Sequence, residues 1–154
     1  MAGRLHGMRA ILLLTILLLA WPAWANELPK GLIKVEASVA ATRTPQRGLV
    51  FGGTTNLPSG TKLMVDFGTD KGQLLAREMA VVAAGAYRTG AFFANGQPLP
   101  AGAYRVRVTT ISGAEQPSHV LALAGPRGEK LTGPLVQAGR DGRVLLLQNI
   151  VQAP

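Results

Sequence analysis

The sequence predicts an all-β protein, a two-sheet β-sandwich of about seven strands preceded by the helix of a signal peptide. Beyond position 25, turn residues interrupt the chain about every ten residues, which is typical of sandwiches and barrels rather than of alternating strand–helix units. Between these turns, apolar and polar residues alternate, as they do in strands that bury one face. Two sheets packed face to face are the commonest way to bury such strand faces.

The first 25 residues have the three parts of a secretory signal peptide. Residues 1–9 contain two arginines and no acidic residue, and residues 10–20 (AILLLTILLLA) carry no charge. Ala23 and Ala25 put small residues at the two positions that a signal peptidase reads, so we expect cleavage after Ala25. The alternative, a membrane anchor, is disfavoured because the apolar run falls well below the ~20 residues that span a bilayer.

We expect a periplasmic or secreted bacterial protein of 129 residues after cleavage, with no transmembrane span. Its 14 basic and 8 acidic residues give a net charge of +6, and it contains no cysteine. A bacterial exported domain that relies on its own core fits this composition. We assign residues 26–125 to the sandwich. Residues 126–154 form a Gly/Pro-rich segment that ends in an apolar strand or short helix, which packs on or extends the sandwich.

Three stretches indicate the first strands. Residues 33–39 (IKVEASV) and 62–67 (KLMVDF) alternate between apolar and polar positions. A Gly-Gly pair interrupts residues 48–55 (GLVFGGTT), which predicts a bulge or a close approach of two backbones. Residues 56–60 (NLPSG) have the composition of a turn.

The middle of the chain contains one ambiguous segment. Residues 73–82 (QLLAREMAVV) are rich in helix formers, but they lie between strands and end in two valines, so we predict a strand. Residues 85–93 (GAYRTGAFF) predict the next strand, and residues 94–102 a corner loop. The strand that follows, YRVRVT, places Arg105 and Arg107 together on its polar side.

The last third of the sequence predicts two further elements. Residues 119–125 (HVLALAG) are predicted as a strand, and the glycine-rich stretch after them as irregular. Residues 143–151 (RVLLLQNIV) predict a last strand or a short helix. This apolar segment closes the sandwich by default, because exposed apolar strands aggregate. Pairing of the same segment with the sheet edge of another chain is the alternative.

Gly102 and Tyr104, at the head of PAGAYRVRV, carry a resemblance to a known family. The chain resembles bacterial exported domains of the immunoglobulin-like or fibronectin type III-like β-sandwich kind, whose role is unassigned, over about residues 32–125. In such sandwiches a corner tyrosine donates its hydroxyl to nearby backbone. The resemblance therefore implies that Gly102 and Tyr104 form a structural tyrosine corner. The sequence lacks the cysteine pair and core tryptophan of antibody-type domains.

The residues available for catalysis are few. Beyond position 25 there is one histidine, His119, and no cysteine. No serine sits in a Gly-x-Ser-x-Gly elbow, and thiolate or multiple imidazole ligands for zinc are missing. We therefore expect no cofactor, no metal and no catalytic residue. The alternative is a small exported hydrolase, or a hydrolase accessory, that uses His119 with an acidic residue.

The positive charge is the feature that bears on function. Arg105 and Arg107 point the same way, and Arg88 lies on a strand that we expect to neighbour theirs. We predict a non-catalytic binding or assembly protein of the cell envelope, with these arginines as candidate contacts to an envelope protein or an anionic surface component. The competing interpretation is that they only solvate the sheet. Exposed aromatic residues for base stacking are scarce, so specific nucleic-acid binding is not expected.

Overall fold

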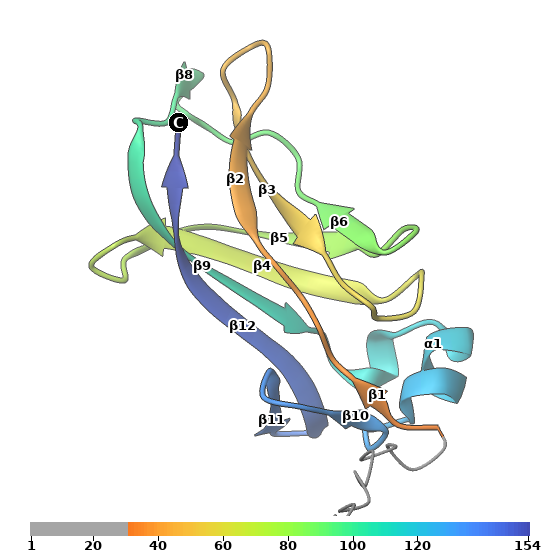
Figure 1. Cartoon of the computed structure of the whole chain (residues 1–154). Coiled ribbons are helices and arrows are strands. Elements are labelled where there is room, and N and C mark those ends of the chain that lie inside the picture. The colour runs from red at the N-terminus through yellow and green to blue at the C-terminus, as the bar shows by residue number, and fades with distance from the viewer. Residues whose placement is uncertain (1–30) are drawn as a thin grey trace, which may run out of the picture.

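The computed structural model describes residues 31–154 and shows a mostly β protein whose strands form several sheets (Figure 1). The largest sheet has five antiparallel strands in the spatial order β11-β12-β9-β4-β5. Its members are β4 (Lys62–Thr69), β5 (Leu74–Val81), β9 (Gly102–Thr110), β11 (Val136–Gly139) and β12 (Gly142–Ala153).

A second sheet of three antiparallel strands has the order β2-β3-β6. It lies across one side of the five-stranded sheet in Figure 1. Two short pairs and two helical segments complete the described part of the chain. The three-stranded sheet consists of β2 (Ala40–Arg43), β3 (Leu49–Thr54) and β6 (Ala86–Arg88). The remaining elements are β1 (Ile33–Lys34) parallel to β10 (Leu131–Thr132), β7 (Phe93–Ala94) antiparallel to β8 (Gln97–Pro98), the 3₁₀ helix η1 (Gly113–Glu115) and α1 (Ser118–Ala124).

The two larger sheets enclose the hydrophobic core. Phe51 of β3 meets Phe67 of β4 with ring centroids 4.6 Å apart, and Tyr104 of β9 packs edge-on against both rings. On β4 and β9 every second side chain enters this core, because successive strand residues point to opposite faces. The predicted all-β architecture with packed sheets is therefore confirmed at this level. The buried alternate residues of these two strands are Leu63, Val65, Phe67, Tyr104, Val106 and Val108.

Several predicted strands have the expected position. β3, β4 and β5 coincide with the stretches 48–55, 62–67 and 73–82. The Gly-Gly pair in β3 lies where two backbones approach closely: a side chain on Gly53 would collide with the carbonyl of Ser38. The predicted strand 85–93 is divided into β6 and β7, and the predicted corner loop after it contains the short strand β8.

The prediction of a strand at residues 119–125 is wrong, because this segment forms helix α1. Pro117 stands at its N-cap, where the missing backbone N–H of proline costs nothing. Only Val120 and Ala124 are buried, and their spacing of four residues is helical, whereas Leu123 is exposed. The sequence Val-Leu-Ala-Leu-Ala is apolar throughout, so it contains no polar residue that would mark the exposed face of a helix. For this reason the sequence alone did not distinguish a helix from a strand.

The apolar C-terminal segment is a strand of the main sheet. Over Gly142–Leu145, β12 pairs with β11, and over Leu146–Ala153 it pairs with β9. This arrangement corresponds to closure of the sandwich rather than to an unpaired segment or a short helix. Among residues 31–154, no helix is long and apolar enough to cross a membrane.

Candidate functional site

Arg107 is part of a cluster of charges on the side of the five-stranded sheet that faces away from the core. The cross-strand register places Gln148, Arg107, Asp66 and Arg77 in one row on β12, β9, β4 and β5. Arg77 Nε donates to Asp66 Oδ1 at 2.5 Å, and Arg107 Nη2 donates to Asp66 Oδ2 at 2.5 Å. Both ion pairs found in the described residues therefore end on Asp66.

The Asp66 side chain is only 7% exposed, whereas those of Arg77 and Arg107 are about half exposed. Burial alone would raise the pKa of Asp66. The hydrogen bonds and positive charges of Arg77 and Arg107 outweigh this effect and hold the pKa of Asp66 below its ordinary value. The carboxylate therefore stays ionised, and it fixes the two guanidinium groups in place.

Arg105 has a different environment from Arg107. It lies two residues from Arg107 along β9, in a row with Ile150, Gly68 and Leu74, and its Nη2 donates to the carbonyl of Asp70 at 2.9 Å. A hollow of about 200 Å³ lies beside this row. No ion pair of the described residues involves Arg105, so its charge is available at this hollow. The hollow is lined by Asp66, Phe67, Gly68, Gly72, Leu74, Arg105, Arg107 and Gln148.

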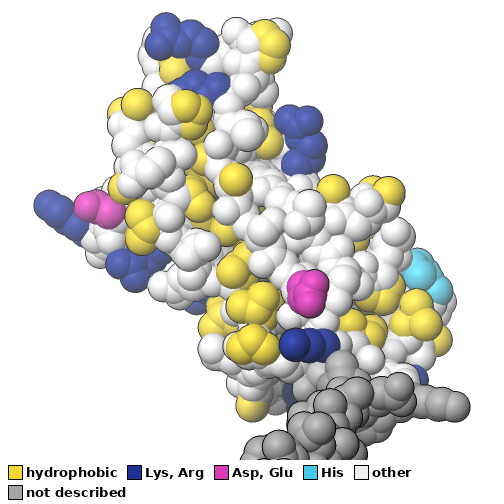
Figure 2. Space-filling view, viewed as in Figure 1, with side chains coloured by type: hydrophobic (Ala, Val, Ile, Leu, Met, Phe, Trp, Pro, Cys, Tyr) yellow, Lys and Arg dark blue, Asp and Glu magenta, His cyan; other side chains and the backbone are white. Residues whose placement is uncertain are grey.

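Arg88 does not join the other two predicted contact residues. It lies on β6, which pairs with β3 in the three-stranded sheet, so the expectation that its strand neighbours the strand of Arg105 and Arg107 is wrong. The mistake arose because Arg88 and Arg105 are close in sequence, and neighbouring strands of a sandwich often belong to different sheets. Figure 2 shows the side of the molecule that carries β2 and β3, where Lys and Arg are scattered singly.

Gly102 and Tyr104 lie at the start of β9, and the tyrosine makes the backbone hydrogen bond that their motif implies. The Tyr104 hydroxyl donates to the carbonyl of Pro100 at 2.8 Å. Sequence reasoning missed a second tyrosine of the same kind: the Tyr87 hydroxyl donates to the carbonyl of Ser38 at 2.6 Å, and burial raises the pKa of Tyr87. Both hydroxyls satisfy backbone carbonyls and are structural.

His119 lies on α1 at the surface, visible as the lone histidine patch in Figure 2. Its Nε2 is 2.8 Å from the carbonyl oxygen of Ser59. No hydrogen bond of the described residues joins His119 to a carboxylate, and within residues 31–154 no group of three His, Asp or Glu side chains could hold a metal ion. Ala23 and Ala25 lie outside the described residues.

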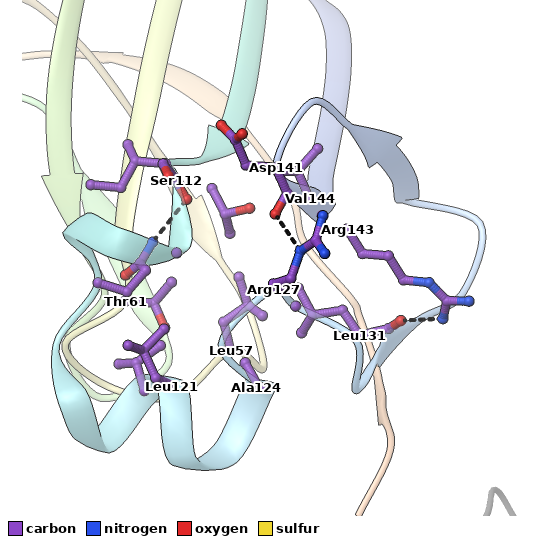
Figure 3. Close-up of a pocket in the computed structure, with 18 of the residues that line it drawn as sticks. Leu57, Thr61, Ser112, Leu121, Ala124, Arg127, Leu131, Asp141, Arg143 and Val144 are labelled. Carbon is purple, nitrogen blue, oxygen red and sulfur yellow. Dashed lines mark hydrogen bonds between the residues drawn. The ribbon is translucent and has the colours of Figure 1, made fainter.

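A pocket of about 150 Å³ lies at the end of the sandwich beneath α1, and sequence reasoning missed it (Figure 3). We call it the basal pocket. Leu57, Leu121 and Ala124 line one side, and Arg127 lies across from them with its Nε directed at the carbonyl of Asp141. No local motif could have revealed it, because its walls come from segments far apart in sequence. Its other lining residues include Ile111, Val120, Leu131, Arg140, Arg143 and Val144.

Comparisons with known proteins identify no relative: no family model, no curated protein and no solved structure matches the chain.

Proposed function

We propose that this chain is a non-catalytic, exported binding protein of the bacterial cell envelope that engages an acidic protein partner. The proposed contact surface, the outer face, is the side of the five-stranded sheet opposite the core. The observation that carries the proposal is a set of exposed apolar side chains around arginines on a sheet face that no other element of residues 31–154 covers. The outer face consists of Lys62, Met64, Asp66, Leu74, Arg77, Met79, Val81, Arg105, Arg107, Leu146, Gln148 and Ile150.

Several large apolar side chains of the outer face are exposed to solvent. Leu74 and Ile150 are 55% and 50% exposed, and Met79 and Val81 are each 49% exposed. They account for four of the seven large, exposed hydrophobic residues in the described part of the chain. Single exposed apolar residues are ordinary, but a group of them on one face marks an interaction surface.

The charge of the outer face favours an acidic partner. It carries Lys62 and three arginines against one acid, Asp66, which the ion pairs already occupy. A second copy of the chain is a poor partner, because a symmetric contact would place these cations against one another. A protein surface with an apolar centre and a few carboxylates complements both the charge and the exposed side chains. Arg105, beside its hollow, is the cation best placed to meet a carboxylate.

Two features support the proposed export of the protein and its proposed relation to immunoglobulin-like sandwiches. The N-terminal sequence has the charge and length pattern of a cleaved signal peptide, which supports export to the periplasm or beyond. The two packed sheets and the hydrogen bond of Tyr104 support kinship with immunoglobulin-like or fibronectin type III-like sandwiches.

Site-specific photo-cross-linking in the producing bacterium tests the proposal. A photoreactive phenylalanine replaces Ile150 on the outer face or, as the matched control, Leu123 on α1, which is 54% exposed. We expect a discrete adduct with an acidic protein from position 150 and none from position 123, and we expect Arg105→Glu to weaken the adduct. Equal adducts from both positions, no adduct, or an adduct with a second copy of the chain would overturn the proposal.

A further inference from the structure

The basal pocket combines an apolar interior with a cation at its border. Aliphatic side chains form part of its walls, and Figure 3 shows Leu57, Leu121 and Ala124 directed into it. Small-molecule sites have this construction: an apolar cavity with a few polar groups that fix the orientation of the ligand. An aliphatic cavity of about 150 Å³ holds one benzene-sized group.

The charge at the pocket is positive, because three cations and one acid line it: Arg127, Arg140, Arg143 and Asp141. Among residues 31–154, the Arg127 guanidinium makes one long hydrogen bond, 3.4 Å from Nε to the carbonyl of Asp141, and its terminal nitrogens bond to no group of this part of the chain. The nearby carboxylate of Glu129 accepts the backbone N–H of Arg127 at 2.8 Å. Hydrogen bonds from the backbone lower the pKa of Glu129, so its carboxylate stays ionised and bound to the N–H groups of its own loop. Arg143, in contrast, directs its Nη1 to the carbonyl of Leu131.

The pocket is held open by backbone contacts rather than by mobile side chains. The N–H of Arg143 donates to the carbonyl of Arg127 at 2.8 Å, which ties the loop after α1 to strand β12. Gly128 and Gly142 permit this approach, because a Cβ on either would collide with the carbonyl of Arg143 or Arg127, respectively. A site formed in advance loses less entropy when a ligand binds.

We infer that the basal pocket binds a small carboxylate with one apolar group of about benzene size. The apolar group lies against Leu57, Leu121 and Ala124, and the carboxylate accepts hydrogen bonds from Arg127. Planar guanidinium groups pair well with carboxylates, which makes this ligand class the natural complement of the pocket. This site is separate from the outer face, so either proposal can fail without the other.

Isothermal titration calorimetry of the full-length chain with 3-phenylpropionate tests the inference. We expect saturable binding of this probe, roughly tenfold weaker binding of the uncharged 3-phenylpropanol, and no binding of propionate, which lacks the ring. Absence of binding by 3-phenylpropionate, or equal binding of the alcohol, would overturn the inference.

Two pairs of variants locate the binding. Ala124→Leu fills the pocket and should abolish binding, whereas Leu123→Ala, on the exposed side of the same helix, should not change it. Arg127→Gln should weaken binding roughly tenfold, whereas Arg88→Gln should not. If Ala124→Leu does not fold, Val144→Phe fills the pocket from another wall. Unchanged binding by a folded, pocket-filled variant would contradict the assignment.

Discussion

Arg107 and Arg127 both border the solvent, but their positions in the fold give them different roles. Arg107 sits on a central strand and is bound to the buried carboxylate of Asp66, which it shares with Arg77. Arg127 sits on a loop, and within the described part of the chain its guanidinium makes one long hydrogen bond, to a backbone carbonyl. The cross-strand register places Asp66 beside Arg107, whereas no carboxylate of the described residues forms an ion pair with Arg127. The number of arginines on a surface therefore says less about binding than the partners that each arginine already has.

The largest expected effect is a loss of stability when a substitution disrupts the backbone contact beside the basal pocket. Gly142→Ala should lower the free energy of unfolding by about 3 kcal/mol, since the new Cβ is strained at φ 138° and also collides with the carbonyl of Arg127. Gly102→Ala is the matched control: its φ is 143°, but its Cβ would enter open space. It should cost only about 1–2 kcal/mol. Equal losses in urea denaturation would show that the loop contact contributes nothing.

The second prediction removes the carboxylate that organises the outer face. Asp66→Asn should lower the free energy of unfolding by about 1–2 kcal/mol, because it weakens hydrogen bonds to two charged groups that stay half exposed and can rehydrate. Asp70→Asn, in the exposed turn after β4, is the control. A loss for Asp66→Asn no greater than for Asp70→Asn would mean that the cluster is not a stabilising feature.

The pH dependence of stability provides a second test of the role of Asp66. The folded pKa of Asp66 lies below its ordinary value of 3.8. Its ionised form therefore stabilises the fold above about pH 4, and this contribution disappears as the pH falls through the lower, folded pKa. Thermal unfolding between pH 2 and pH 6 should show a smaller acid-induced decrease for Asp66→Asn than for the wild type. Parallel pH profiles would contradict this account of Asp66.

The smallest expected effects compare the two arginines of β9. Arg107→Gln should lower the melting temperature, because Arg107 donates two hydrogen bonds to Asp66. Arg105→Gln should leave it almost unchanged, because Arg105 donates one hydrogen bond from an exposed position to the carbonyl of Asp70. Differential scanning calorimetry of the two variants measures the contrast. The reverse order would mean that Arg105, rather than Arg107, belongs to the scaffold.

Strand alternation let the sequence predict much of the fold. It predicted the buried side of β4 and β9 and the outward direction of Arg105 and Arg107. The strand character of β5 was predicted instead from the strands on either side and from its two terminal valines. Alternation failed for α1, where an unbroken apolar stretch fits both periodicities. Alternation also could not assign each strand to one of the two sheets. Arg88 belongs to the three-stranded sheet, whereas Arg105 and Arg107 belong to the five-stranded sheet.

The candidate sites were harder to predict than the fold, because they depend on contacts between distant segments. Asp66 resembled an ordinary polar strand residue until the register placed it between Arg77 and Arg107. The basal pocket brings together Leu57, α1 and the start of β12, and nothing in any one of these segments marks a ligand. The one sequence feature connected with the pocket is the pair of glycines, Gly128 and Gly142, that allow two backbone segments to approach closely.

The affinity of the protein captured at position 150 for outer-face variants tests the central claim most directly. The purified partner is titrated with Arg105→Glu and Ile150→Ser, and with the control variants Arg88→Glu and Leu123→Ser, which change the same residue type or a similarly exposed apolar residue elsewhere. We predict roughly tenfold or greater weakening for the first pair and wild-type affinity for the controls. Equal weakening by both pairs, or full affinity of Arg105→Glu and Ile150→Ser, would contradict the outer face as the binding surface.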